Sequence, residues 1–246
     1  MRVFIDVGAH YGEAVAIALD PAWGFDKIVA VEPAAICHPL LRRYRDSRLS
    51  IEAIALGNRS GAAILHGAGL LGASIYAAKR QKSKLGASST QSIQIVRASD
   101  WFRSHIPDAS EVFIKFNCEG AECDIIEDLL SGGCADRLTS LYVDFDVRKV
   151  AGQAHRQHDI EAQLQKHRIH YTTPETLGVD GPGGVAKWLA ADCPREQSSW
   201  NLTWRYKLGL HQPAYVWLKI FLRAALPLRL YNWLGQHFGN LARTSR

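Results

Sequence analysis

The residues with the clearest potential for chemistry follow the first apolar run of the chain, in the stretch 6–13. In this stretch, every second position from 6 to 12 is occupied by Asp6, Gly8, His10 and Gly12 in turn. Glycine lets the backbone approach a ligand closely, and the amides at the start of a following helix favour a carboxylate. A dinucleotide-binding loop needs Gly-x-Gly-x-x-Gly, but His10 replaces the middle glycine and the third is absent. The loop therefore predicts a ligand without a pyrophosphate, although two glycines after a strand also fit a simple turn.

An acid ends the next apolar run of the chain. This residue, Glu32, lies 24 residues after Gly8. An acid at this place can accept hydrogen bonds from both hydroxyls of a ribose, and the alternative is a solvated strand end. Together, Asp6, Gly8, Gly12 and Glu32 have the layout of an S-adenosylmethionine site. The glycine loop would hold the methionine portion of this cofactor, and Glu32 its ribose.

A third polar group follows the apolar run 111–116. It contains Lys115, Asn117, Glu119, Gly120 and Glu122. Open α/β sheets bind ligands at the carboxyl ends of their strands, where we expect these side chains to lie. Carboxylates next to a helix start also serve as caps and as partners of the helix dipole. Both interpretations stay open on the sequence alone.

Strands and helices alternate along the part of the chain that carries these residues. Apolar runs predict strands over 2–7, 27–32, 50–56, 111–116 and 139–145, and helical spacing predicts helices over 12–20, 38–46, 121–130 and 158–167. This alternation favours a Rossmann-like, doubly wound α/β fold, whose mostly parallel sheet has helices on both faces. Two further strands are expected on either side of a polar insertion at 79–90, and 181–184 is expected to be a loop. We divide the chain into a domain of residues 1–195 and a helical C-terminal extension of residues 196–246.

The order and spacing of these motifs resemble the FkbM-type S-adenosylmethionine-dependent methyltransferases over about residues 2–150. The matching runs are FIDVGAHYGE, VAVEP, IEAIALGNRSG, ASD-WF and IKFNCEGAE. Members usually read D-V-G-A-N-x-G, F-E-P, A-L-G-D-x-x-G, L-D-D and K-I-D-V-E-G-A-E at these places. The resemblance implies a class I methyltransferase fold and O-methylation, often of sugars or polyketide-type products.

The resemblance also implies which residues bind the cofactor. The residues that match its cofactor-binding positions are Asp6, Gly8, His10, Gly12, Glu32, Asn58, Asp100 and Asn117. Two departures from the usual pattern matter here, because His10 and Asn117 stand where Asn and Asp are usual. The change at Asn117 removes a charge near the expected reaction centre, which also favours a second hypothesis, a catalytically weakened binding or scaffold protein.

Transfer of a methyl group to a hydroxyl benefits from a general base. The candidates are Glu119, Glu122, Lys115 and His10, of which we favour Glu119 because it follows the strand end nearest the expected methyl group. Asp144 and Asp146 end the following strand, where they would either line an acceptor pocket or be exposed charges. The histidine pairs of 155–158 and 167–170 lie among polar residues, so we expect a solvated surface there and no metal site.

The charge of the protein is unevenly distributed. The 246 residues carry a formal net charge of +5, but residues 197–246 contain seven cations and no Asp or Glu, which leaves about −2 for residues 1–196. Because the body is mildly acidic, a nucleic-acid methyltransferase is the least favoured hypothesis. Polar residues recur on one face of a basic, aromatic helix after Pro227, so residues 205–243 could contact a membrane peripherally, or pack on protein. Homo-oligomerisation stays open.

The sequence also suggests a compartment. Five cysteines are scattered without a C-x-x-C pair, which is typical of reduced thiols in a cytoplasmic protein. The first apolar run is interrupted at Asp6, so we expect no secretory signal. We therefore expect a cytoplasmic enzyme, which would act at the inner face of the membrane if the tail binds lipid.

Overall fold

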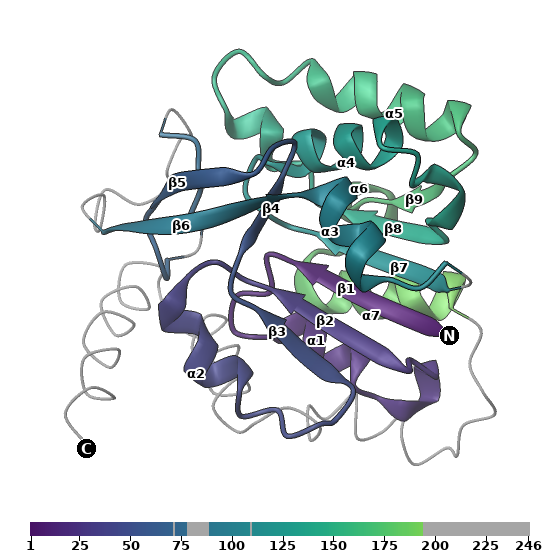
Figure 1. The fold of residues 1–246 in the computed structure, drawn as a ribbon. Helices are drawn as coiled ribbons and strands as arrows, with labels where there is room; N and C mark the ends of the chain where they lie inside the picture. Colours follow the sequence, from purple (N-terminus) through teal and green to yellow (C-terminus); the bar gives the residue numbers. More distant parts are fainter. Residues whose placement is uncertain (71, 78–88, 109, 194–246) are drawn as a thin grey trace, which may run out of the picture. The chain divides into compact units, whose positions relative to one another are not determined.

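A computed structural model of the chain describes residues 1–70, 72–77, 89–108 and 110–193. Its centre is a six-stranded sheet with the order β3-β2-β1-β7-β8-β9, in which all neighbours pair in parallel (Figure 1). The strands are β1 (Arg2–Val7), β2 (Lys27–Val31), β3 (Leu49–Glu52), β7 (Glu111–Phe116), β8 (Ser140–Val143) and β9 (His170–Thr172). The predicted Rossmann-like α/β architecture is confirmed.

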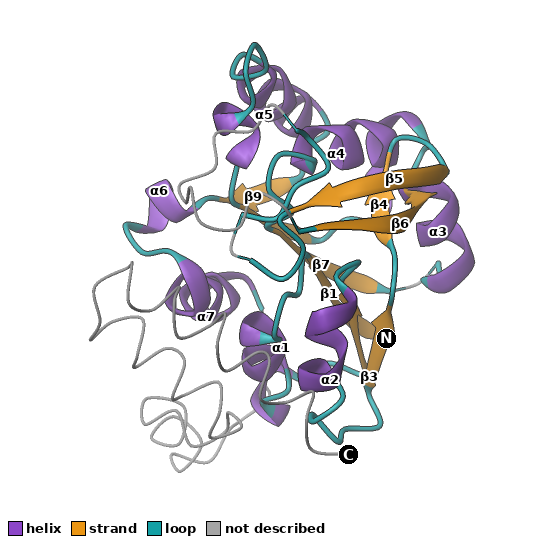
Figure 2. Cartoon of the chain, turned by 90° about the vertical axis from the view of Figure 1, so that its left-hand side faces the viewer, coloured by secondary structure: helices purple, strands orange, loops and turns teal. Residues whose placement is uncertain are grey.

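Helices cover both faces of this sheet, because successive side chains of a strand point to opposite sides. On one face, Val3, Ile5 and Val7 of β1 share an apolar cluster with residues of α3, α4 and α5. On the other face, Phe4 contacts Trp188 of α7, and α7 packs against α1 (Figure 2). The helices are α1 (Glu13–Ala18), α2 (His38–Leu41), α3 (Ala98–His105), α4 (Glu122–Ser131), α5 (Arg156–Lys166), α6 (Pro174–Leu177) and α7 (Gly181–Asp192).

Short 3-10 turns connect several of these elements. They span Pro21–Trp23, Ala35–Cys37, Ala135–Arg137 and Asp146–Lys149. The prediction of one helix over 38–46 was too long, because α2 ends at Leu41.

A second, three-stranded sheet consists of β4 (Ala55–Gly57), β5 (Gly61–His66) and β6 (Thr90–Arg97). In the order β4-β6-β5, β6 pairs in parallel with β4 and antiparallel with β5. The prediction of one strand over 50–56 was therefore wrong. The chain leaves the main sheet after Glu52 and enters the second sheet at Ala55, so one apolar run serves two sheets.

The predicted loop at 181–184 is the first turn of α7. Proline at the second residue of this helix loses no hydrogen bond, because the first N–H groups of a helix have no intrahelical partner. A Cβ on Gly184 would lie 2.4 Å from Oη of Tyr142, so glycine at 184 allows α7 to pack against β8. The glycines that suggested a loop thus serve helix packing.

The expected C-terminal helical extension, residues 196–246, lies outside the described residues. Among the helices that the structure does describe, none has both the length and the apolar character needed to cross a membrane.

Candidate functional site

The carboxyl end of β1 is the point at which the strand order reverses. β1 has β2 on one side and β7 on the other. The connection from β1 to β2 and the connection from β7 to β8 therefore run toward opposite edges of the sheet. Gly8 and Ala9 donate backbone hydrogen bonds to O of Val31 (3.0 and 3.1 Å). Asn117 donates one to O of Val7 (3.0 Å). Open α/β sheets bind ligands at such a reversal, so the three polar groups of the sequence meet at the edge where a ligand is expected.

Close packing explains the two glycines of the first loop, against backbone at Gly8 and against side chains at Gly12. Gly8 has φ +80°, and a Cβ there would lie 2.0 Å from O of Asn117. Gly12 has φ +88°, and its Cβ would lie 2.6 Å from Cε2 of Tyr44. Both positions therefore exclude a side chain, and the loops after β1 and β7 touch through their backbones.

Asp6 and Lys115 form a buried ion pair beneath this contact. They are register partners on β1 and β7, and Nζ of Lys115 lies 2.7 Å from Oδ1 of Asp6 and 2.9 Å from O of Gly8. Burial raises the pKa of Asp6, and the positive charge of Lys115 opposes that rise. Oδ2 of Asp6 is buried without a hydrogen-bond partner in the described structure. Lys115, a candidate base in the sequence, thus fixes the start of the loop.

Glu32 connects the end of β2 to the same loop. Its carboxylate accepts hydrogen bonds from N of His10 (2.7 Å) and N of Ala34 (2.8 Å). The side chain is buried, and Nε2 of His38 donates to its backbone carbonyl oxygen (2.7 Å). The predicted ribose-binding acid is therefore placed beside the glycine loop, as the spacing of the two motifs suggested.

The sequence reasoning missed Glu13, whose carboxylate occupies the amino end of α1. It accepts a hydrogen bond from N of Tyr11 (3.2 Å) and lies 3.2 Å from Nδ1 of His10. Burial alone would raise the pKa of Glu13, but the neighbouring His10 holds it below its usual value. The only signal for this role was an acid directly after Gly12, which is common at helix starts.

The loop after β7 has an unusual backbone conformation. Glu119 has φ 62° and Gly120 has φ 116°. In the loop after β1, His10 is a second non-glycine residue with left-handed backbone (φ 51°). Such conformations cost energy for residues with a side chain, and they concentrate at functional sites. Their occurrence in both loops that meet at the strand reversal supports a binding role for this edge.

The side chain of Glu122 forms hydrogen bonds with the loop between β7 and α4. Its Oε1 accepts hydrogen bonds from N of Cys118 (3.1 Å) and N of Gly120 (3.0 Å), and the residue is fully buried. These contacts match the capping alternative for this carboxylate. Glu119 lies half-buried at the tip of the loop, and its backbone carbonyl accepts a hydrogen bond from Oγ of Ser74 (2.7 Å).

Residues 67–70 and 72–77, which follow β5, lie against these loops. No motif in the sequence had indicated this. Oη of Tyr11 donates to O of Gly69 (3.3 Å), and Ser74 contacts the loop after β7 through O of Glu119. A Cβ on Gly69 would lie 2.4 Å from Cγ2 of Ile36, which follows β2. Through Gly69 and Ser74, this part of the chain therefore contacts the residues that follow β1, β2 and β7.

Two residues that the resemblance assigned to the cofactor lie elsewhere. Asn58 is exposed in the turn after β4. Asp100 lies in the first turn of α3, 56% exposed, and pairs with Arg103 of the same helix (2.6 Å). In the described part of the chain, neither forms a hydrogen bond or an ion pair with the loop after β1.

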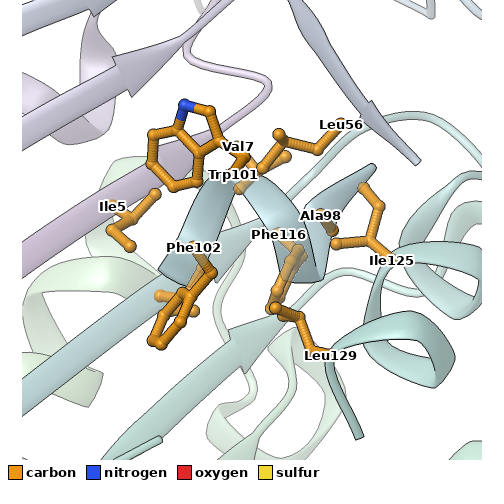
Figure 3. Close-up of a pocket in the computed structure, with 10 residues that line it drawn as sticks. Ile5, Val7, Leu56, Ala98, Trp101, Phe102, Phe116, Ile125 and Leu129 are labelled. Carbon is orange, nitrogen blue, oxygen red and sulfur yellow. The ribbon is translucent and has the colours of Figure 1, made fainter. Parts of the chain in front are cut away.

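A small cavity lies beneath α3, between this helix, the sheet and α4 (Figure 3). Its volume is about 10 Å³, and its walls include Val7, Leu56, Trp101 and Phe116. This is the size of about one water molecule, whereas small-molecule sites occupy hundreds of cubic ångströms. The cavity is therefore a packing gap of the core.

Comparisons of the chain with models of known protein families, with curated proteins and with solved structures find no match. Among the described residues, His, Cys, Asp and Glu side chains form no group of three or more that could hold a metal ion. The fold and the edge define an open α/β protein with a carboxylate-rich site at the strand reversal.

Proposed function

We propose that this protein is an S-adenosylmethionine-dependent O-methyltransferase that acts on a hydroxyl of a saccharide, a glycolipid or a related natural product. The observation that carries the proposal is the charge of the loop edge. Asp6, Glu13 and Glu32 bring three carboxylates to the exits of β1 and β2, and Lys115 brings one cation. An acidic edge favours a ligand with positive charge.

The position of Glu13 favours binding of S-adenosylmethionine over binding of a dinucleotide. In dinucleotide-binding proteins the pyrophosphate lies on the amino end of the first helix. In this protein the carboxylate of Glu13 occupies that end, where it would repel a pyrophosphate. S-adenosylmethionine has no phosphate, and its sulfonium and ammonium cations outnumber its single carboxylate, so its net charge is positive.

The residues present fit this cofactor, which supplies an activated methyl group when bound. Gly8 and Gly12 allow the backbone to approach the methionine portion. The oxygens of Glu32 each accept one backbone hydrogen bond, and each retains a second lone pair for a ribose hydroxyl. Lys115 and Asp6 hold the loop in place, and the orphaned Oδ2 of Asp6 can accept one further hydrogen bond.

The proposed enzyme is cytoplasmic, and its residues 205–243 either contact the inner face of a membrane or pack on protein. Flotation with anionic liposomes distinguishes these alternatives: membrane contact predicts that the full chain floats and that a chain ending at Ser199 remains in solution. Equal flotation of both chains would exclude a membrane role for this tail.

A second candidate function is a binding protein without transferase activity, which Asn117 favours. This residue lies against Gly8 at the centre of the edge and carries an uncharged amide. Cofactor binding by itself would fit either candidate, whereas methyl transfer distinguishes them.

Calorimetry with S-adenosylmethionine and NAD tests the cofactor. We expect binding of the first and no binding of the second. Glu32→Gln should weaken binding by about 10- to 100-fold, since a hydrogen bond to a charged group contributes about 1.5–3 kcal/mol. Glu161→Gln, on α5, is the matched control and should bind normally. Binding of NAD, or normal binding by Glu32→Gln, would contradict the assignment.

A radiolabelled methyl-transfer screen against lipid-linked and soluble glycans tests the reaction. We expect the label to appear in a glycan as a base-stable ether. Cofactor binding without transfer to any glycan would favour the binding-protein candidate.

A further inference from the structure

The parallel hydrogen bonding of the main sheet continues one residue beyond the ends of β1, β7 and β8. N of Gly8 donates to O of Val31, N of Asn117 to O of Val7, and N of Asp144 to O of Phe116 (2.9 Å). Each bond follows the last register pair of its strands. Gly8, Asn117 and Asp144 therefore lie on one level in adjacent strands, which are about 4.8 Å apart in a parallel sheet.

The side chain of Asp144 belongs to the same face of the sheet as Asp6 and Lys115. Lys115 is the register partner of Asp6 and of Tyr142, and side chains two residues apart in a strand share a face. Asp144 follows Tyr142 by two residues. Burial, and next the charge of Asp144, raise the pKa of the Tyr142 hydroxyl.

Asp144 differs from the acids around it. Asp146 is paired with Lys149, and Glu175 with Arg148 (2.7 Å). In the described structure, the half-buried carboxylate of Asp144 forms no hydrogen bond or ion pair of its own. Burial and the neighbouring Asp146 raise the pKa of Asp144. The charged and titratable groups that face Asp144 are Tyr142, Asp146, Arg148, Lys149 and Glu175.

We propose that Asp144 is the catalytic carboxylate that takes the proton from the acceptor hydroxyl. This assignment rests on the proposed function and replaces Glu119 as the favoured base. The acceptor oxygen forms a bond to the methyl carbon, and the carbon–sulfur bond breaks with its electron pair passing to sulfur. The hydroxyl proton passes to Oδ of Asp144, and S-adenosylhomocysteine remains. Asp144 thereby supplies, from the adjacent strand, the negative charge that Asn117 lacks.

Calorimetry with S-adenosylmethionine and S-adenosylhomocysteine tests the position of Asp144 without an acceptor. The two compounds differ in the charge on sulfur, so a carboxylate facing the methyl group should favour the first. Asp144→Asn should lower the ratio of the two affinities by about tenfold, as expected for a charge roughly 10 Å away at an effective dielectric constant of about 20. Asp144→Glu should retain the ratio, and so should Asp159→Asn on α5, an exposed control.

Methyl transfer in the glycan screen tests the proton transfer itself. Asp144→Asn should lower kcat by about 100-fold or more and remove the acidic limb of its pH profile, with circular dichroism confirming the fold. An unchanged affinity ratio, or wild-type turnover by Asp144→Asn, would overturn the assignment of Asp144 alone. Wild-type protein that binds cofactor without transferring methyl would overturn it as well, in favour of the binding-protein candidate. Absence of cofactor binding by the wild type would overturn the proposed function itself.

Discussion

Replacing Lys115 by methionine should strongly destabilise the protein. Lys115 and Asp6 have side chains 9% and 0% exposed, and their charged atoms lie 2.7 Å apart. Methionine has a similar length but no charge, so the carboxylate of Asp6 would stay buried without a cation. Removal of one partner from a buried ion pair costs about 3–5 kcal/mol, which for a chain of this size lowers the unfolding temperature by about 6–20 °C.

The deficit of Lys115→Met should also depend on pH. Burial raises the pKa of Asp6 in the folded protein above its ordinary value of 3.8, so the folded state binds this proton more tightly than the unfolded state. Stability from this group is therefore fully present below pH 3.8 and is lost as the pH rises through the folded pKa. Loss of Lys115 raises the folded pKa further. The deficit relative to wild type should therefore be larger at pH 8 than at pH 5.

Urea unfolding at pH 5 and pH 8, followed by circular dichroism, measures both effects. Lys166→Met, at the exposed end of α5, is the matched control and should leave the free energy of unfolding unchanged. The double variant Asp6→Asn with Lys115→Met should recover much of the loss, because it has no buried charge. Equal stability of Lys115→Met and Lys166→Met, or a deficit that is larger at pH 5, would refute the reasoning.

Two further variants test the packing of the site and of its support. Gly8→Ala should cost about 1–3 kcal/mol more than Gly133→Ala, because both glycines have positive φ (+80° and +73°) but only Gly8 faces a backbone oxygen at 2.0 Å; equal unfolding free energies would show that the loops can separate. Asp128→Asn should cost about 1.5–3 kcal/mol at pH 7, because this buried carboxylate accepts hydrogen bonds from N of Ser99 and Nε of Arg97. Burial opposes the ionised form of Asp128, but these hydrogen bonds lower its pKa. The wild type should therefore lose this stability as the pH falls through that pKa. Acid titration of Asp128→Asn should show a smaller loss of stability.

Much of the fold could be predicted because its signals are local. Apolar runs ending in Gly8 and Glu32 placed β1 and β2 almost to the residue, and the run 111–116 coincides with β7. The predicted strand 50–56 failed for a physical reason. An apolar run indicates burial, but it does not indicate which sheet buries it, and here Glu52 and Ala55 belong to different sheets.

The site could be predicted where residue type alone limits the conformation. Gly8 and Gly12 have left-handed backbone and no room for a Cβ, so their identity already indicated close packing. The roles of Asp100 and Glu122 depended instead on where each side chain points. Asp100 faces solvent on α3, and Glu122 faces the amides of its own loop.

By itself, the sequence determined the alternation of strands and helices, the glycine loop and the acid that follows β2. Only the tertiary structure decided that β7 lies beside β1, with Asp6 opposite Lys115 and Asp144 level with Asn117. Strand order and register arise from hydrogen bonds and burial between segments more than 100 residues apart, as for Asp6 and Lys115. The local spacing of residues does not indicate such pairings, so the side chains that share the site could be identified only from the tertiary structure.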